Sequence, residues 1–305
     1  MNAIEAMQEE IGCQVEGLSR QELLPRRDEN CLFVGSGDSY VAGLVAQHVS
    51  GGRAICCYPT DLIQNPLSVA SGRSVYIVSI SGSTKANILA AKVAKRRGVC
   101  TTAITARLAS PLARACDRTI ELKYKSTGVT TSGTISFTSS MLTCISLVTK
   151  VTLPDLTKIY RHAEKQAGQI AGEIGTKKSN YFILGNGVLH PIAIYGALKF
   201  NEVFGAKAMP YQAEEFCHSP LFSAKNGDQM IVMGSDGKRL SDRLMQEGFS
   251  SVHVDFKGTG IELLLQSTFF MQLLVLRLAQ RRRMTSCYFL NNKRLLRTSS
   301  DFIYG

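Results

Sequence analysis

The sequence lacks the residue spacings that mark disulfide frameworks and zinc sites. Its nine cysteines are odd in number, no two form a C-x-x-C pair, and no Cys/His pairs occur at zinc-ligand spacing. Most of the cysteines lie in apolar stretches typical of strands or helices. This distribution indicates small buried side chains in a reducing compartment. We therefore expect a cytoplasmic protein with no metal site and no cofactor.

A secretory signal and a clear membrane span are also missing. The N-terminal segment is acidic and amphipathic, with no basic region ahead of an apolar stretch. The longest apolar runs cover residues 141–151 and 261–278, and the second contains Glu262, Gln266, Gln272 and Arg277. These polar residues argue against a span, which needs about 20 largely apolar residues. We expect no membrane partner.

The net charge of +11 permits nucleic acid, an anionic membrane or a small anionic substrate as partner. The basic residues are mostly dispersed, and the clusters at 92–97 and 281–283 fit solvated helix ends. No zinc finger, RNP motif or clear helix-turn-helix accompanies them. A nucleic-acid partner would rest on net charge alone, and we expect none.

The length of 305 residues, of which 45% are apolar, predicts two globular domains. Short apolar runs alternate with helical patterns, which favours parallel βαβ units. The stretches CLFVGSGDSYVAGLVA and YFILGNGVLHPIAIYGAL each combine an apolar strand, a G-x-G turn and a helix, so the second half repeats the plan of the first. The sequence predicts an α/β fold with two tandem doubly wound parallel sheets and flanking helices, in domains 1–152 and 153–305. Expected strands are 31–34, 54–57, 74–80, 99–105, 119–124, 181–184, 208–211, 229–234 and 251–255. Expected helices are 1–28, 40–49, 85–97, 111–116, 139–150, 155–175, 191–204, 241–247 and 261–282, and residues 214–218 are expected to form a turn or a short helix.

Two turns in the first half are candidates for anion binding. Residues 35–39 (GSGDS) follow a predicted strand and precede a helix, where backbone N–H groups and the helix N-terminus favour a phosphate. An ordinary capped βα turn has the same composition. Residues 79–84 (SISGST) hold four hydroxyls at one helix start, more than capping requires. Neither turn is a dinucleotide fingerprint or a Walker A loop.

The strand, the S-x-S-G-x-T turn and the upstream G-[ST]-S-Y turn resemble the sugar isomerase (SIS) domain. Two such domains in tandem resemble the isomerase half of glucosamine-6-phosphate synthase, from about residue 31 to residue 255. The resemblance implies flavodoxin-like domains that bind a phosphorylated sugar. It implies that the phosphate contacts Ser39, Ser79, Ser81 and Thr84, with a backbone N–H from Ile80.

Other positions in the first half match the family's sugar site more loosely. Gly37 and Asp38 lie in the first turn, and Thr131 and Ser132 lie in a loop that is similar to the family's V-A-S-T-K segment. The loop carries an extra residue or two and lacks the family's lysine. The resemblance implies that these four residues contact the sugar.

The second half holds the acid–base candidates. The stretch ALKFNE resembles the family's A-L-K-x-K-E helix, which implies that Glu202 is the base shuttling a proton between C1 and C2, with Lys199 beside it. Alone, Glu202 would be interpreted as an exposed helix carboxylate. The stretch AEEFCHSPL resembles E-x-x-H-G-P-L, which implies that His218 opens the sugar ring. In the family this histidine comes from the neighbouring subunit, so the resemblance implies a homodimer with shared active sites.

The C-terminal tail resembles the family's P-R-N-L-A-K-S-V-T-V-E only weakly. The simplest alignment puts Arg297 where the family's imine-forming lysine stands, and arginine cannot act as an amine nucleophile. Lys293 lies nearby in a different register and could substitute for that lysine, and both Lys293 and Arg297 are candidates for contact with the substrate.

Three functions stay open on this basis. Aldose–ketose isomerisation of a hexose- or hexosamine-6-phosphate leads, and deamination of glucosamine-6-phosphate follows through the same enol(amine). A non-catalytic phosphosugar-binding regulatory protein is the alternative, although the joint presence of Glu202 and His218 favours an enzyme. We find no glutaminase half, so we do not expect synthesis from glutamine by this chain alone.

Overall fold

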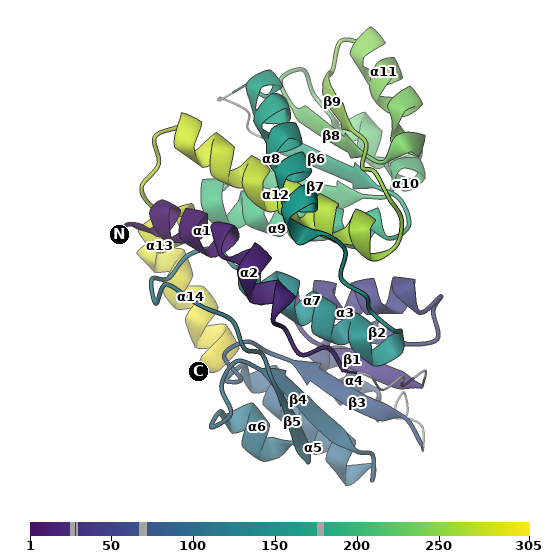
Figure 1. Cartoon of the computed structure of the whole chain (residues 1–305), viewed down its shortest axis with the longest axis vertical. Coiled ribbons are helices and arrows are strands. Elements are labelled where there is room, and N and C mark those ends of the chain that lie inside the picture. The colour runs from purple at the N-terminus through teal and green to yellow at the C-terminus, as the bar shows by residue number, and fades with distance from the viewer. Residues whose placement is uncertain (25–27, 29, 67–71, 176–179) are drawn as a thin grey trace. The chain divides into compact units, whose positions relative to one another are not determined.

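The computed structural model describes residues 1–24, 28, 30–66, 72–175 and 180–305. The chain forms two compact units (Figure 1). Unit 1 comprises Met1–Ser19, Ser126–Thr134 and Thr152–Asn291. Unit 2 comprises Arg20–Lys125, Ile135–Val151 and Asn292–Gly305.

The sheet of unit 2 has five parallel strands in the order β2-β1-β3-β4-β5. Strand β1 therefore lies between β2 and β3, and the chain winds away from it in both directions. The turns after β1 and β3 meet at this reversal of strand order, where open α/β sheets usually bind ligands. The strands are β1 (Cys31–Val34), β2 (Ile55–Cys57), β3 (Ser74–Val78), β4 (Thr101–Thr105) and β5 (Arg118–Glu121).

Helices cover both faces of this sheet because its strands are apolar on both sides. Leu32 and Val34 of β1 join a buried cluster with α4 (Pro59–Gln64), α5 (Lys85–Arg96) and α6 (Pro111–Ala115). On the opposite face α3 (Asp38–Val49) packs against β1 and against α7 (Ile135–Val148), which is buried along almost its whole length (Figure 1).

Unit 2 also contains α14 (Lys293–Tyr304), which the sequence did not predict as a helix. The side chain of Asn292 caps its N-terminus by accepting from the N–H of Leu295 at 3.2 Å. The helix packs against α5, and Lys85 Nζ donates to the carbonyl oxygen of Gly305. None of its residues is buried, although Leu295 and Leu296 recur as Phe302 and Ile303 seven residues later, which is a helical spacing of apolar residues.

The sheet of unit 1 has four parallel strands in the order β7-β6-β8-β9. One face packs on α10 (Ala213–His218), a 3-10 turn (Pro220–Ser223) and α11 (Lys238–Gln246) through a cluster around Phe182, Phe216 and Val232. Helix α9 (Leu189–Phe204) packs against β6 and β7 from the other side. The strands are β6 (Asn180–Gly185), β7 (Lys207–Tyr211), β8 (Gln229–Met233) and β9 (Ser250–Val254).

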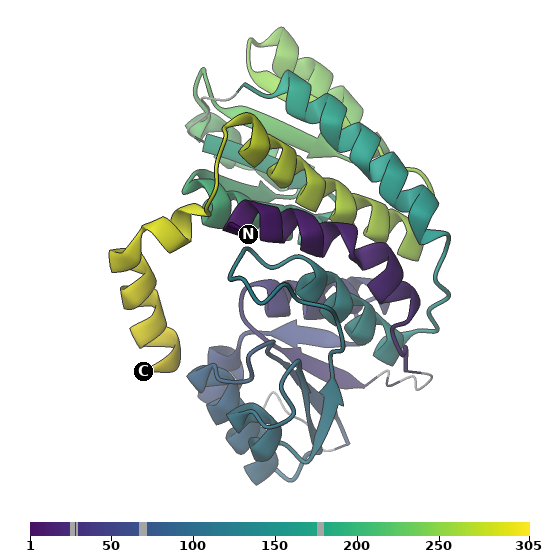
Figure 2. The ribbon, with the colours of Figure 1, turned by 60° about the vertical axis from the view of Figure 1, so that its left-hand side comes forward.

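The long helix α12 (Ile261–Arg281) forms a further layer of unit 1. It packs against α8 (Leu156–Glu173), α9 and α1 (Ala3–Gly12), and Figure 2 shows α1, α12 and α8 side by side. By length and composition alone α12 could cross a membrane. The expectation that its polar residues argue against a span is therefore not supported by composition. Burial of most of the helix inside unit 1 accounts for its hydrophobicity.

The N-terminal region differs from its prediction. Two short helices, α1 and α2 (Gln14–Ser19), replace the single helix expected over 1–28, whose residues 25–27 lie outside the described part. Glu10, one of the acidic residues of this amphipathic segment, is buried with only 8% of its surface exposed.

The predicted domain limits at 152/153 stay a prediction. Residues 1–19 and 126–134 pack in unit 1, and residues 292–305 pack in unit 2. The two compact units therefore interleave along the chain.

A pair of glycine substitutions tests the packing of α3 on its sheet. A Cβ on Gly43 would lie 2.7 Å from Phe33 Cβ and 2.9 Å from Cys56 Sγ, whereas a Cβ on Gly168 of α8 meets nothing within 4 Å. We expect Gly43→Ala to lower the free energy of unfolding by about 1–3 kcal/mol. Gly168→Ala should raise it by about 0.5–1 kcal/mol, because alanine loses less entropy in a helix. Urea unfolding measures both, and a neutral Gly43→Ala would contradict the close packing.

Candidate active site

The turn after β1 places Ser39 at the start of α3. Gly37 adopts a φ of +56°, a conformation that favours glycine, and no side chain caps the helix there. Asp38 and Ser39 occupy the first turn and are half-buried. In the described part of the chain, the hydroxyl of Ser39 makes no hydrogen bond. This hydroxyl is therefore available to a ligand at the carboxyl ends of β1 and β3.

The turn after β3 brings the remaining phosphate candidates to the start of α5. Ser79 is buried, and its Oγ accepts from the N–H of Gly82 at 3.2 Å. Ser81 Oγ accepts from Ser83 Oγ at 2.9 Å. Because both oxygens act as acceptors in these bonds, each hydroxyl keeps its hydrogen for donation.

The N-terminus of α5 has no side-chain cap. Thr84 occupies the N-cap position, yet its side chain makes no capping hydrogen bond. The backbone N–H of Ile80 likewise has no acceptor among the residues that the structure describes, while its carbonyl accepts from the N–H of Ala106 at 3.2 Å. Four hydroxyls thus surround a helix start that none of them caps, which is a suitable arrangement for an anion.

Unit 1 contains the acid–base candidates Lys199 and Glu202. They lie three residues apart on α9, so their side chains share one face of the helix. Lys199 Nζ donates to Glu202 Oε2 at 2.7 Å. The lysine side chain is 1% exposed and the glutamate side chain 36% exposed. The cation is therefore buried beneath a carboxylate that still reaches solvent.

Ser132 is the third member of this cluster. Its buried hydroxyl donates to the same Oε2 of Glu202, at 2.6 Å. Neighbouring Thr131 instead donates to the carbonyl of Ala3 at 2.8 Å and lies 3.9 Å from Cys287 Sγ. Burial raises the pKa of the Cys287 thiol, so it stays protonated at neutral pH.

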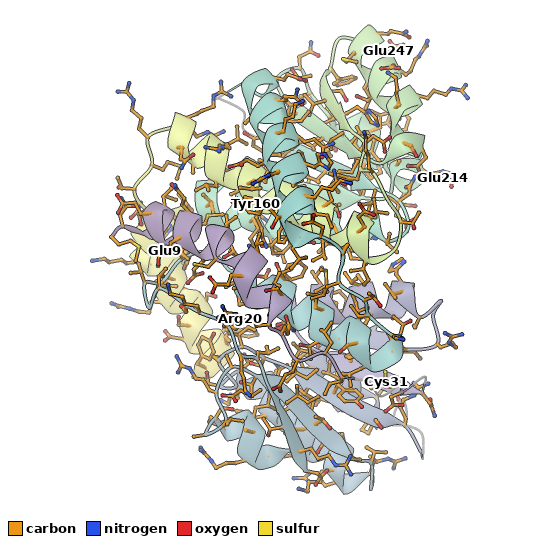
Figure 3. The ribbon with its side chains drawn as sticks, viewed as in Figure 1. Glu9, Arg20, Cys31, Tyr160, Glu214 and Glu247 are labelled. Carbon is orange, nitrogen blue, oxygen red and sulfur yellow. The ribbon has the colours of Figure 1, made fainter. Side chains whose placement is uncertain are left out.

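His218 ends α10, and its side chain is 69% exposed. Its Nε2 lies 3.7 Å from Glu214 Oε1, and Glu214 is itself 90% exposed at the outer side of unit 1 (Figure 3). Throughout the described ranges, no hydrogen bond or ion pair joins His218 to Lys199 or Glu202.

The tail candidates lie on α14 in unit 2. Lys293 and Arg297 are both exposed. Neither side chain has a hydrogen-bond partner within the residues described.

Sequence reasoning missed Glu10 and Tyr195. Glu10 Oε1 accepts from Ser126 Oγ and Thr127 Oγ1 at 3.0 and 3.2 Å, and the hydroxyl of Tyr195 donates to the carbonyl of Gly133 at 2.7 Å. Both hold the loop that carries Ser132. Glu10 comes three residues after Met7, and Ile11 comes four residues after Met7. This spacing would have placed Glu10 on the apolar face of its helix.

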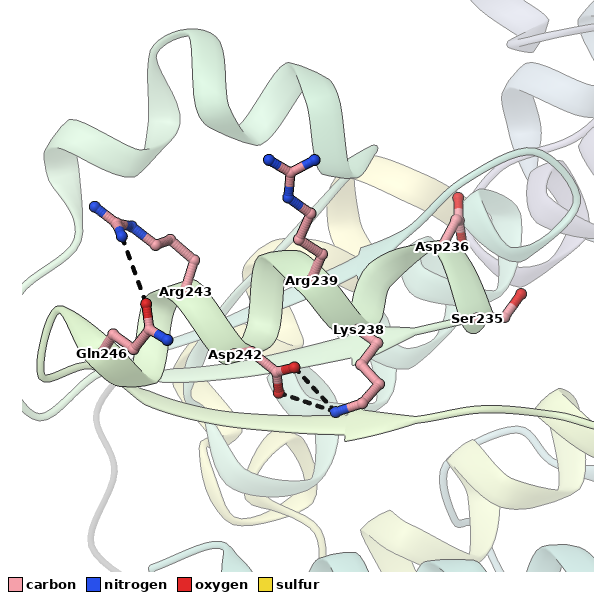
Figure 4. A pocket seen from close by; sticks show the side chains of 7 residues that line it. All are labelled: Ser235, Asp236, Lys238, Arg239, Asp242, Arg243 and Gln246. Carbon is pink, nitrogen blue, oxygen red and sulfur yellow. Dashed lines mark hydrogen bonds and ion pairs between the residues drawn. The ribbon is translucent and has the colours of Figure 1, made fainter.

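A separate hollow of about 730 Å³ lies along α11 and contains none of these candidates (Figure 4). Lys238 pairs there with Asp242 at 3.0 Å, and Arg239 and Arg243 extend on one side of the helix. Its lining residues are Ser235, Asp236, Lys238, Arg239, Asp242, Arg243 and Gln246.

The first half of the chain matches a known family. The family model of the SIS domain covers residues 26–150. This stretch is similar to the SIS domain. Its sequence includes both hydroxyl-rich turns and the loop of Ser132, although that loop packs in unit 1.

The relatives extend the likeness beyond the SIS domain. A glutamine–fructose-6-phosphate aminotransferase (isomerizing) of Sulfurisphaera tokodaii is 28% identical over 260 residues, which cover 78% of this chain and 44% of the relative. The chain thus spans less than half the length of that protein.

Solved structures show the same fold. The C-terminal domain of glucosamine-fructose-6-phosphate aminotransferase from Francisella tularensis has a TM-score of 0.74 at 19% identity, covering 92% of this chain and 97% of that domain. Glucosamine-6-phosphate deaminase from Thermotoga maritima has a TM-score of 0.71 at 20% identity, covering 93% and 94%. At these identities the likeness establishes the α/β fold with two parallel sheets.

Two substitutions separate the charge of Lys199 from its packing. Methionine keeps most of the buried volume and removes the charge, while Glu202 can still be hydrated and bonded by Ser132. Alanine leaves a cavity as well. We expect Lys199→Ala to lower the free energy of unfolding by about 2–4 kcal/mol more than Lys199→Met does. Equal losses, measured by urea unfolding, would assign the whole effect to the ion pair.

Proposed function

We propose that this chain binds a hexose- or hexosamine-6-phosphate and interconverts its aldose and ketose forms, or deaminates the amino sugar, through an enol(amine) intermediate. Glu202 is the base. The observation that carries the proposal is the carboxylate of Glu202, which is partly exposed and fixed at one oxygen by Lys199 and Ser132. Both donors bind Oε2, and within the described residues Oε1 accepts no hydrogen bond.

The chemistry follows from this asymmetry. Isomerisation moves a proton between C1 and C2 of the sugar. A base can remove this proton because a hydrogen on the carbon next to a carbonyl is acidic. Oε1 takes the proton from the carbon next to the carbonyl, so that the carboxylate becomes a carboxylic acid, and the carbonyl oxygen takes up a proton from water to give an enol or enolamine. The same Oε1 returns its proton to the neighbouring carbon, whose hydroxyl loses a proton to water as the new carbonyl forms. Lys199 and Ser132 keep the carboxylate in one orientation through the transfer.

Unit 2 binds the phosphate in this proposal. The hydroxyls of Ser39, Ser79, Ser81 and Thr84 donate to its oxygens, with the N–H of Ile80 and the uncapped start of α5. Gly37 lets the first turn approach the ligand, and Asp38 contacts it. The SIS domain over residues 26–150 supports this assignment.

The remaining groups have secondary roles. We propose that the second parallel sheet builds a second domain of the same kind, so that the SIS domains are in tandem. His218 opens the sugar ring across a homodimer with shared active sites, which its exposure supports. Thr131 contacts the sugar. On α14, Lys293 is the amine that can form an imine, and Arg297 contacts the substrate. Nine free cysteines support a reducing, cytoplasmic location.

Turnover tests the proposed base. The protein is incubated with glucosamine-6-phosphate, with fructose-6-phosphate plus ammonia, and with each hexose-6-phosphate alone, and sugar and ammonia are quantified. We expect Glu202→Gln to lower kcat by about 100- to 10,000-fold with substrate binding retained. Glu173→Gln, an exposed glutamate of the same unit, is the control and should leave kcat unchanged. Full activity of Glu202→Gln would remove Glu202 as the base, and binding without turnover by the unaltered chain would indicate a non-catalytic phosphosugar-binding regulatory protein.

Affinity tests the phosphate turn. We expect Ser81→Ala and Thr84→Ala each to weaken binding of a hexose-6-phosphate by about 10-fold or more, since each removes a donor to a charged group. Calorimetric titration measures this, with Ser223→Ala as a control on the surface of unit 1. Affinity for the unphosphorylated hexose should not change. An equal loss for both ligands would show that these hydroxyls do not contact the phosphate.

A further inference from the structure

Glu10 has a carboxylate that is buried within unit 1. It lies on α1 with 8% of its surface exposed, and in the described ranges it forms no ion pair. Taking a carboxylate out of water is costly unless hydrogen bonds replace its hydration. Among the described residues, every hydrogen bond that the carboxylate of Glu10 accepts comes from one segment, the loop of residues 126–134.

The carboxylate joins the two ends of this loop. At the start of the loop, Oε1 accepts from Ser126 Oγ at 3.0 Å and from both the N–H and the hydroxyl of Thr127 at 3.2 Å. At its end, Oε2 accepts from Thr134 Oγ1 at 3.4 Å. A single side chain thereby closes the base of the loop.

The part of the loop around Ser132 contacts Glu202. Ser132 Oγ donates to Glu202 Oε2 at 2.6 Å, and the adjacent carbonyl of Gly133 accepts from Tyr195 on α9. Glu10, the loop and α9 all belong to unit 1. A continuous set of hydrogen bonds and one short backbone segment therefore connects the buried carboxylate to the proposed base.

We propose that Glu10 is a positioning residue for Glu202, acting through the loop 126–134 and the hydroxyl of Ser132. This inference rests on the proposed function. Glu10 does not touch the substrate. Its four hydrogen bonds fix the loop so that Ser132 and Lys199 share one oxygen of Glu202 and leave the other to accept the proton.

The test compares Glu10→Ala, Glu10→Gln and Ser132→Ala with the control Ile11→Ala. Ile11 is fully buried on the same helix and bonds no loop residue, so its truncation lowers stability without freeing the loop. We expect Glu10→Ala to lower kcat by about 10- to 100-fold with KM little changed, because misplacement of a reacting group slows the chemical step. Glu10→Gln should recover most of the rate, since an amide can satisfy the same donors and donate to Thr134. Ile11→Ala should keep its kcat.

A double-mutant cycle shows whether the effect passes through Ser132. In the Ser132→Ala background, Glu10→Ala should reduce kcat no further. Additive losses, or an equal loss in Ile11→Ala, would overturn the inference while leaving Glu202 as the base. If Glu10→Ala does not fold, Thr127→Val removes one hydrogen bond to Glu10 and should lower kcat in the same non-additive way.

A measurement without turnover separates this inference from the proposed function. The carboxyl carbon signal of Glu202, observed by NMR, should shift in Glu10→Ala in the same direction as in Ser132→Ala and stay in place in Ile11→Ala. Hydrogen exchange of the Thr127 N–H should accelerate in Glu10→Ala, because that N–H loses its acceptor. Absence of turnover in the unaltered chain would overturn only the catalytic role of Glu202. An unmoved Glu202 signal would overturn the positioning role of Glu10.

Discussion

In both units every described strand pairs in parallel with its neighbours, so the chain must return to the amino-terminal end of the sheet before each new strand. All strand-to-helix turns therefore gather at the carboxyl ends of the strands, where helix N-termini and glycine-containing turns offer backbone donors. In unit 2 the order β2-β1-β3 brings two such turns together at the point where the strand order reverses, and both are rich in hydroxyls. The candidate phosphate site is a consequence of this pairing, with Thr84 left free of a capping role at the start of α5.

Glu10 and Glu202 show how neighbouring elements give two carboxylates different tasks. Glu10 is enclosed by hydroxyl and N–H donors, with all of its bonds directed at one loop. Glu202 is half-exposed, is bonded at one oxygen only, and has a buried ammonium beneath it. The first arrangement suits a fixed structural group. The second leaves one oxygen accessible for proton transfer.

Most strands and long helices could be predicted, because the patterns that specify them are local. The apolar runs at β1, β3, β6 and β8 and the hydroxyl-rich turns stand directly in the sequence. Helix α14 was missed although its apolar residues recur at helical spacing, and the long N-terminal helix was overextended. The contact of Ser132 with Glu202 and the burial of Glu10 join residues 70 and more than 100 positions apart. Only the family resemblance placed Glu202 and Ser132 at one site, and nothing in the sequence pattern connected Glu10 to either.

The interleaving of the two units has a consequence for how such a chain can be divided or recombined. The chain passes between units after residues 19, 125, 134, 151 and 291. A cut at the apparent midpoint would separate α1 and the loop 126–134 from the helices they pack against, and would remove α14 from α5. Neither half is then a self-contained module, so exchange of one half with a relative would have to preserve Glu10, its loop and α9 together. Shuffling by whole sequence halves would break the unit that holds Glu202.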